Sequence, residues 1–342
     1  MAKRVGLDVG YGFVKATDGA KGFSFPSVIG QGHEKPVFST RMEKRPLIED
    51  LKVSIGGDSY FVGRAAMRHA KYVQRDLSYT RAADGMFQVL VFSALSLFAD
   101  GQQNEFKVVT GLPPERMHLM QDVEKRMQQR VTVTLHEGKR SKDIDIWVSD
   151  VEVVPQPLGT YWSYVLNSQG IAKGDLSGRV GIIDIGFRTS DLALIEDGDY
   201  VPEKSKTIPV ASSTAYSHIT EGLVTKYGFE AEGYILDEAV ITKKINVSGE
   251  SLDITDIVKS AFQKLASAVL IEMNSFWRLQ DLDLMILSGG GGKGIYEFLL
   301  PAIPRLRMSE QPVTANSIGF LSWANRKWGG TFEEDGDDAG AF

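Results

Sequence analysis

The chain repeats one short pattern of residues in its two halves, and this repeat restricts its fold more than any other feature. Gly6–Gly10 leads from an apolar run into Asp, one apolar residue and Gly, and Ile182–Gly186 repeats the pattern. In each copy a second apolar run reaches an Asp-Gly pair, Asp18-Gly19 or Asp197-Gly198. Asp-Gly between extended runs predicts a hairpin turn, because both central residues need positive φ. The spacing far exceeds a solenoid repeat, so we interpret it as duplication of a domain.

Predicted strands and helices alternate around the two copies. We expect buried strands at Phe106–Thr110 and Leu282–Leu287, a helix buried on most faces at Met86–Ala99 and started by Asp84, and a long amphipathic helix at Ile254–Trp277. Residues 22–83 and 206–254 are more polar and fit a smaller subdomain inserted into each half. The alternation predicts an α/β fold with mixed sheets.

Each copy of the repeat ends a buried strand with a carboxylate, and a Gly-rich turn follows. Such an Asp can face Mg²⁺ through its waters, while unhindered N–H groups in the turn approach phosphate oxygens. In the first copy these residues are Asp8, Gly10 and Gly12, and Lys15 would return along the second strand to meet the phosphate charge. For one copy alone, an Asp that caps its own hairpin is an equal alternative. Two copies in the same context favour the phosphate site.

The second copy presents the same chemistry from Asp184 and Gly186. Its donors are Arg188, Thr189 and Ser190. A run of four glycines follows a predicted strand and is a third candidate, at Gly289, Gly290, Gly291 and Gly292. Glycine there lets the chain pass close under a base or ribose. Taken alone, the run is better explained as a flexible strand-to-helix loop.

These residues together resemble the actin superfamily, and five segments carry the resemblance in the right order. They are Asp8–Lys15 (first phosphate loop), Val154–Gly159 (first interdomain connection), Ile183–Asp191 (second phosphate loop), Leu287–Gly291 (adenosine motif) and Ala315–Phe320 (second connection). Val108–Pro113 further resembles the prokaryotic actin-like group of ParM and archaeal actin. The resemblance implies an actin-like ATPase fold: two duplicated α/β domains, each with a smaller inserted subdomain, and a nucleotide cleft between them.

The resemblance also implies a site for Mg-ATP, with GTP left open. Asp8 and Asp184 would orient the hydrated Mg²⁺, and Lys15 would hold the β- and γ-phosphates. Gln156 falls where the family has the residue that orients the attacking water. Because a Gln is not a strong base, positioning and charge stabilisation by Mg²⁺ and Lys15 would carry the reaction.

Three loops would contact the nucleotide. Their implied residues are Gly10, Tyr11, Gly12, Phe13 and Lys15 in the first, Gly186, Arg188 and Thr189 in the second, and Gly289, Gly290 and Gly291 in the third. Tyr11 and Phe13 are bulky where small or hydroxyl residues are common in the family, so we expect backbone contacts there.

The predicted domains follow from the same motifs. Domain I spans 1–157, contains the insert 22–83 and is completed by 318–330; domain II spans 158–317 and contains the insert 206–254. Residues 331–342 carry five acids and no bases, and we expect a disordered acidic tail. The net charge of −6 therefore leaves the rest of the chain near neutrality.

Composition excludes several classes of protein. Without cysteine there is no disulfide framework, thiolate metal site or cysteine nucleophile. The sequence contains no long basic run, so we expect no direct nucleic-acid groove. Met86–Ala99 is the longest apolar stretch and is shorter than the roughly 20 residues of a membrane span. Asp8 interrupts any signal-peptide core, so we expect no direct membrane contact and a cytoplasmic protein.

The function we predict is an ATPase that polymerises into filaments with Mg-ATP and depolymerises after hydrolysis. Its task would be plasmid or DNA segregation or related cytoskeletal work, with itself and a DNA-bound adaptor protein as partners. A small-molecule kinase of the same fold superfamily is the alternative. A chaperone ATPase is disfavoured, because only the acidic tail follows the nucleotide-binding part.

Overall fold

A computed structural model describes residues 2–32, 45–75, 85–138, 140–175, 177–231 and 233–330, with backbone only at 233–235. Its residues fall into two compact units. Unit 1 draws on Met1–Leu176 and Thr314–Phe342, and unit 2 is Ser177–Val313. Residues 158–176, predicted in domain II, thus group with unit 1, and the predicted boundaries stay a prediction. The predicted tail and Asp84 lie outside the described residues.

Unit 1 is built on one ten-stranded mixed sheet. Its strands in spatial order are β3 (Gly22–Pro26), β2 (Phe13–Thr17), β1 (Lys3–Val9), β8 (Gln103–Leu112), β10 (Arg140–Pro155), β9 (Arg130–Glu137), β5 (Lys52–Ile55), β6 (Asp58–Val62), β4 (Ile29–Gln31) and β7 (Val73–Gln74). Strand β8 is parallel to β1 and β10, and the other neighbours are antiparallel. At 16 residues, β10 is long enough to pair with both β8 and β9, so it joins the strands of the predicted insert to the main sheet.

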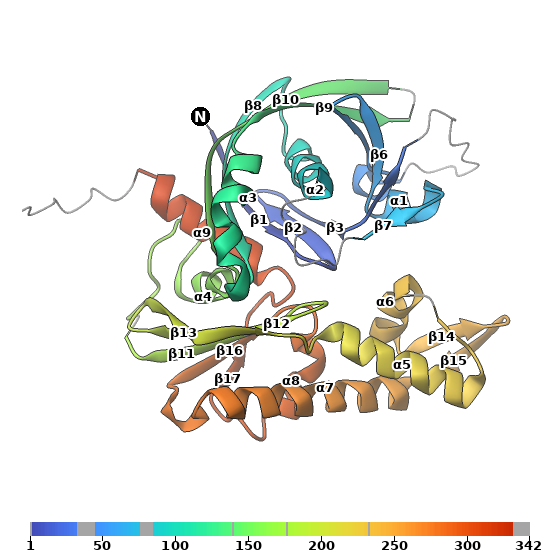
Figure 1. Ribbon diagram of the computed structural model, residues 1–342, viewed down its shortest axis with the longest axis vertical. Coiled ribbons are helices and arrows are strands. Elements are labelled where there is room, and N and C mark those ends of the chain that lie inside the picture. Colours follow the sequence, from blue (N-terminus) through green and yellow to red (C-terminus); the bar gives the residue numbers. More distant parts are fainter. Residues whose placement is uncertain are drawn as a thin grey trace, which may run out of the picture. The chain divides into compact units, whose positions relative to one another are not determined.

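Helix α2 (Gly85–Ser96) forms the centre of the core of unit 1. Figure 1 shows it inside the curve of the sheet. From Met86 to Ser96 every side chain except Gln88 is buried, which confirms the predicted helix buried on most faces, although it ends three residues early. The other helical segments are η1 (Leu47–Glu49), α1 (Arg64–His69), η3 (Pro114–Leu119), α3 (Met120–Met127), α4 (Pro157–Val165) and α9 (Ala315–Trp328).

Helix α9 packs tightly between β1 and α4, because glycine stands at both contacts. A Cβ on Gly6 of β1 would lie 2.0 Å from the carbonyl oxygen of Ser317 in α9. A Cβ on Gly319 of α9 would lie 1.7 Å from the carbonyl oxygen of Gly159 in α4. Larger residues would push these elements apart, so the glycines set the distance between β1 and the start of α4.

Unit 2 has a five-stranded mixed sheet. In spatial order its strands are β13 (Asp199–Ile208), β12 (Ser190–Glu196), β11 (Arg179–Ile185), β16 (Leu284–Ser288) and β17 (Leu306–Met308). Strand β16 is parallel to β11 and β17, and the remaining pairs are antiparallel. Its other elements are α5 (Ser212–Tyr227), α6 (Gly233–Thr242), the hairpin β14 (Lys244–Val247) and β15 (Glu250–Asp253), α7 (Thr255–Phe276), η4 (Leu279–Asp281) and α8 (Gly292–Leu299). Figure 1 shows α7 and α8 on the same side of the sheet.

Helix α7 confirms the predicted long amphipathic helix. Val258, Ala261, Leu265 and Val269 are buried as expected, and Phe262 joins them in the core.

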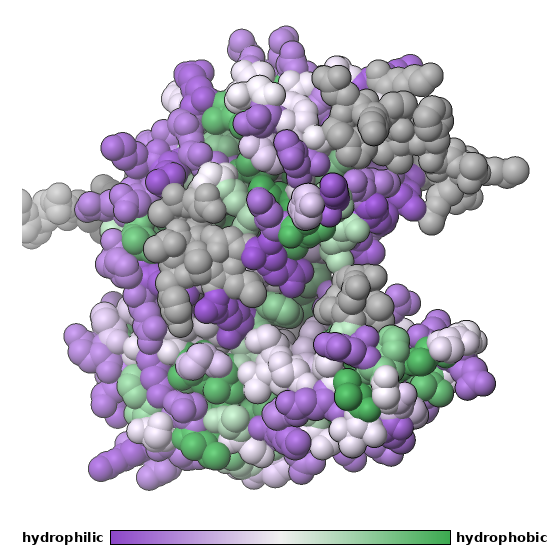
Figure 2. Space-filling view, turned by 45° about the vertical axis from the view of Figure 1, so that its right-hand side comes forward, coloured by the Kyte–Doolittle hydropathy of each residue, from purple (hydrophilic) through white to green (hydrophobic). Residues whose placement is uncertain are grey.

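Hydrophilic side chains cover much of the face seen in Figure 2, with hydrophobic groups between them. Within the described ranges, every helix falls short of the length or apolar character needed to cross a membrane.

The two Asp-Gly pairs form different turns. Asp197 and Gly198 have φ of 52° and 91° and form the predicted two-residue turn between β12 and β13. Asp18-Gly19 also lies in a predicted hairpin turn, because β2 and β3 pair antiparallel on either side of it. The expected positive φ is found at Gly19 but not at Asp18, which begins a four-residue connection. There the Asp18 carboxylate accepts hydrogen bonds from the N–H groups of Ala20 and Lys21, at 3.0 and 2.7 Å. An Asp side chain can stabilise a turn in this way without left-handed backbone.

Candidate functional site

In unit 1 the carboxylate of Asp8 meets two other predicted site residues. Asp8 lies near the end of β1 and is 2% exposed. Lys15 is its cross-strand partner in β2 and places Nζ 3.1 Å from Asp8 Oδ2. Gln156 Nε2 donates to Asp8 Oδ1 at 3.2 Å. Burial of a charge is costly without partners, so the two donors compensate for the desolvation of this carboxylate.

The position of Gln156 follows from its backbone. Its N–H donates to the carbonyl of Leu112 at the end of β8, at 2.7 Å. Pro157 then begins α4, a position where proline is favoured because the N–H of the first helical residue has no partner within the helix. A Cβ on Gly111 would lie 2.8 Å from Gln156 Cα, so glycine in β8 admits the close approach.

The turn Gly10–Gly12 joins β1 to β2 and is held by Ser27, a residue that the sequence analysis did not single out. Ser27 is fully buried, and its Oγ donates to the carbonyl of Gly10 at 2.5 Å. Its N–H donates to the carbonyl of Gly12 at 2.9 Å. A Cβ on Gly10 would lie only 3.0 Å from the carbonyl oxygen of Phe13, so glycine at this position permits the narrow turn.

The two bulky residues of this loop have partners within unit 1. The ring of Tyr11 faces the buried guanidinium of Arg116, with 5.1 Å between Arg116 Cζ and the ring centroid. Phe13 is the first residue of β2 and pairs with Pro26 of β3. These contacts engage the Tyr11 ring and the Phe13 backbone in the fold, and the predicted backbone contacts to phosphate stay a prediction.

Unit 2 contains a hairpin of the same register. Asp184 lies near the end of β11, is 4% exposed and pairs with Asp191 of β12. Gly186 begins the turn, and its N–H donates to the carbonyl of Thr189 at 3.0 Å. Arg188, half-buried, lies within the same turn, and Thr189 is 8% exposed. The predicted residues of the second phosphate loop are therefore contiguous around one narrow turn.

The glycine run packs directly on this loop within unit 2. Gly289 has φ of 83°, and a Cβ there would lie 2.5 Å from Asp184 Oδ1. The N–H of Gly291 donates to the carbonyl of Ile185 at 3.0 Å, whereas a Cβ on Gly290 would meet nothing within 4 Å. Helix α8 then begins at Gly292. The fold thus brings the second and third predicted loops together.

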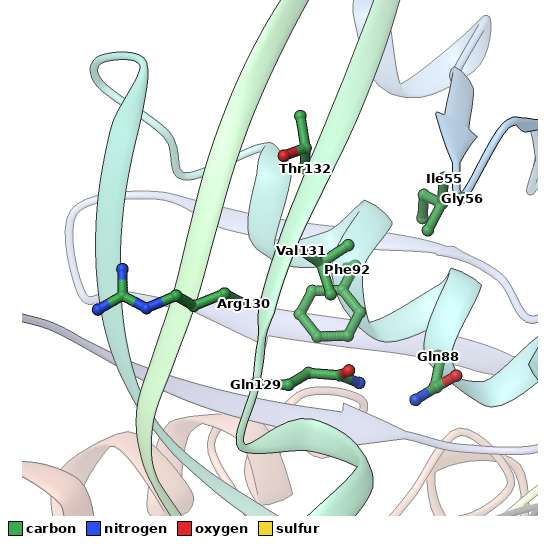
Figure 3. Close-up of a pocket in the computed structure, with 8 residues that line it drawn as sticks. All are labelled: Ile55, Gly56, Gln88, Phe92, Gln129, Arg130, Val131 and Thr132. Carbon is green, nitrogen blue, oxygen red and sulfur yellow. The ribbon is translucent and has the colours of Figure 1, made fainter.

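A pocket of about 390 Å³ elsewhere in unit 1 contains none of the predicted site residues (Figure 3). Ile55, Gly56, Gln88, Phe92, Gln129, Arg130, Val131 and Thr132 line it. The side-chain amides of Gln88 and Gln129 both donate to the carbonyl of Arg126. Figure 3 shows the Arg130 side chain extending away from both glutamines, and its guanidinium lies 4.2 Å from the centroid of the Trp147 ring. Gln88, Gln129 and Arg130, which line the pocket, thus have partners within unit 1.

Comparison with known families identifies both halves of the chain. Residues 6–159 match the model of the actin-like protein N-terminal domain, and residues 182–300 match that of the C-terminal domain of the MreB-like archaeal actin homologue. The chain belongs to the actin superfamily, in agreement with the resemblance carried by its motifs. Its structural neighbours include ParM and archaeal actin homologues. Comparison with curated proteins gave no match.

Solved structures share the fold over nearly the whole chain. A 15-stranded ParM filament from Clostridium botulinum has a TM-score of 0.77 at 22% identity, over 95% of this chain and 100% of that one. An archaeal actin homologue in complex with ADP has a TM-score of 0.76 at 21% identity, also over 95% and 100%. The actin-like protein Alp7A has a TM-score of 0.78 at 14% identity, over 95% and 96%.

Proposed function

We propose that this protein binds and hydrolyses a magnesium-bound nucleoside triphosphate, with ATP as the nucleotide and GTP as the competitor to test. The observation that carries the proposal is the placement of Asp8 between Lys15 and Gln156. A buried carboxylate that could attract a metal thus lies beside a cation that could neutralise phosphate and an amide that could orient water. The archaeal actin homologue in complex with ADP supports nucleotide binding by this fold.

The residues present fit Mg²⁺ and a triphosphate. Mg²⁺ keeps several waters and is usually held by one or two carboxylates together with substrate phosphates. Asp8 and Asp184 supply such carboxylates, while the described residues contain no group of three or more His, Asp or Glu side chains that could hold a metal alone. The bound ion would neutralise phosphate charge. The chain itself would supply N–H donors from the turns after Gly10 and Gly186.

Each side chain has a separate task in this proposal. Lys15 contributes positive charge to the β- and γ-phosphates, and Arg188 and Thr189 add donors from unit 2. Gln156 orients the attacking water through its side-chain amide, because it cannot accept the proton as a strong base would. Gly289, Gly290 and Gly291 leave room for the nucleoside, since no side chain projects there.

We further propose that nucleotide binding drives assembly of this chain into filaments, for plasmid or DNA segregation or a related cytoskeletal task in the cytoplasm. The likeness to a ParM filament supports this proposal. A DNA-bound adaptor protein would link such a filament to its cargo. Head-to-tail contacts that do not close on themselves produce filaments, and hydrolysis would weaken those contacts.

Sedimentation tests the assembly. With Mg-ATP the protein should pellet above a critical concentration and return to the supernatant as phosphate is released. The same reactions carried out with GTP decide which nucleotide is preferred. Protein that stays monomeric at tens of micromolar with a non-hydrolysable nucleotide, yet phosphorylates a small molecule in a phosphotransfer screen, would establish the kinase and overturn the filament.

A further inference from the structure

Two serines make the same contact in the two units. Ser27 Oγ donates to the carbonyl of Gly10 at 2.5 Å, and Ser212 Oγ donates to the carbonyl of Gly186 at 2.9 Å. Both glycines stand two residues after the aspartate of their hairpin. Ser27 is fully buried and Ser212 is 8% exposed. The serines come from different local structures, since one follows β3 and the other begins α5.

Each turn has a second carbonyl held from the same segment. In unit 1 the N–H of Ser27 donates to the carbonyl of Gly12 at 2.9 Å. In unit 2 the N–H of Ser213 donates to the carbonyl of Phe187 at 2.8 Å. Two carbonyl oxygens of each turn are therefore fixed in direction by hydrogen bonds.

The direction of these carbonyls matters for binding an anion. Successive N–H groups in a turn can form a concave donor surface, but a carbonyl oxygen turned into it would repel phosphate. Because the peptide unit is planar, holding a carbonyl on one side directs the N–H of the same peptide group to the other side. The serine contacts thus favour a turn whose amides share one direction.

We propose that Ser27 and Ser212 are positioning residues that hold the two phosphate loops in the conformation that binds the triphosphate. The proposal rests on the proposed nucleotide-binding function. It assigns a role to both serines that does not require either to touch the nucleotide. The repeat of the contact on equivalent glycines of two units, from unrelated local structures, is what sets it apart from an incidental hydrogen bond.

The test is equilibrium binding of Mg-ATP and of adenosine to four alanine variants. Ser27→Ala and Ser212→Ala should each weaken Mg-ATP binding by about tenfold, the effect of one lost hydrogen bond and a relaxed turn. Adenosine, which lacks phosphate, should bind as to wild type. The controls are Ser96→Ala and Ser205→Ala, whose hydroxyls donate to the carbonyls of Ser93 and Val201, and they should leave both affinities unchanged.

Steady-state kinetics and a conservative variant separate positioning from simple destabilisation. A loop that binds ground state and transition state equally poorly raises KM and leaves kcat near wild type. Ser212→Thr keeps the hydroxyl and should restore Mg-ATP affinity. If thermal melting shows Ser27→Ala unfolded, Ser212→Ala and Ser212→Thr still decide the matter.

The binding measurements distinguish failure of the serine positioning role from failure of the proposed nucleotide-binding function. If wild type binds Mg-ATP and both Ser27→Ala and Ser212→Ala bind it with wild-type affinity, the positioning role is overturned. The proposed function is then left standing. Equal losses for ATP and adenosine would likewise overturn it, because the effect would then not concern phosphate. Wild type without measurable nucleotide binding would overturn the proposed function and this inference together.

Discussion

Lys15 and Asp191 occupy the same position in two matched hairpins, yet they carry opposite charge. Lys15 pairs with Asp8 across β1 and β2, and Asp191 pairs with Asp184 across β11 and β12. Asp191 Oδ1 accepts a hydrogen bond from Thr207 Oγ1 at 2.7 Å. The two hairpins thus share their backbone register but differ at this position, which is a lysine in unit 1 and an aspartate in unit 2.

Replacing Lys15 should weaken nucleotide binding selectively. We expect Lys15→Met to lower Mg-ATP affinity by about 10- to 100-fold, as for loss of a charge-assisted hydrogen bond to phosphate. Lys107→Met is the control, because Lys107 Nζ pairs with Asp150 at 2.9 Å on the surface, where ion pairs contribute little. Isothermal titration calorimetry measures both. Equal affinities of Lys15→Met and wild type would remove Lys15 from the site.

Truncating Gln156 should separate binding from hydrolysis. Gln156→Ala is expected to bind Mg-ATP and assemble, while phosphate release falls by roughly 100-fold, the scale for losing one preorganised donor. Filaments should then persist longer in a light-scattering trace. Gln128→Ala, which removes an exposed contact to the carbonyl of Ser149, should behave as wild type. A Gln156→Ala protein that fails to bind nucleotide would contradict the water-orienting role.

His136 should make unit 1 less stable at acid pH. Burial, together with its cross-strand neighbour Lys52, lowers the pKa of His136 below its ordinary value of 6.5. A base with a lowered folded pKa stabilises the fold fully above its unfolded pKa, and this contribution is lost as pH falls through the folded value. Urea unfolding should therefore show stability falling below about pH 6.5.

His136→Gln tests this assignment. The variant should flatten the acid limb of the stability profile, whereas exposed His118→Gln should leave it unchanged. His136 Nε2 also lies 2.8 Å from Ser54 Oγ, so some loss of stability at neutral pH is expected from the broken contact. An acid limb with the wild-type slope in His136→Gln would exclude this histidine as its source.

A side chain at Gly319 should destabilise the contact between α4 and α9. Gly319→Ala is expected to cost about 1–3 kcal/mol by overpacking, because its Cβ would meet the Gly159 backbone. Trp162 and Trp323 stack across the same helix pair with 4.4 Å between centroids, so near-ultraviolet circular dichroism should change as well. Gly174→Ala, whose Cβ would meet nothing within 4 Å, is the matched control. Unaltered melting and spectra in Gly319→Ala would refute the close packing.

The features that could be predicted from the sequence are those set by local geometry. A turn between antiparallel strands places Asp8 opposite Lys15 because their spacing matches the hairpin, and the second copy places Asp184 in the same way. The Asp197-Gly198 turn follows from the backbone preferences of its two residues. For Gln156, the family resemblance placed the residue, and the structure adds its hydrogen bond to Asp8.

The remaining features depend on contacts between distant segments. Ser27 and Ser212 have no motif of their own, and only the folded chain brings their hydroxyls to Gly10 and Gly186. Asp18 shows the reverse case, where side-chain hydrogen bonds replaced the backbone conformation that its dipeptide predicts. Pairing of β9 with β5 likewise makes one continuous sheet from strands that a sequence pattern assigns to separate parts.

Binding stoichiometry tests the central claim most directly, that both units contribute to binding one nucleotide. Calorimetric titration of wild type with a non-hydrolysable ATP analogue and Mg²⁺ should give one nucleotide per chain, and omission of Mg²⁺ should weaken binding. Asp8→Ala and Asp184→Ala should each lose most of that affinity while melting as folded proteins, and Asp150→Ala, on the surface, should retain it. Wild-type affinity in either site variant, or two nucleotides per chain with each variant losing one, would contradict the account.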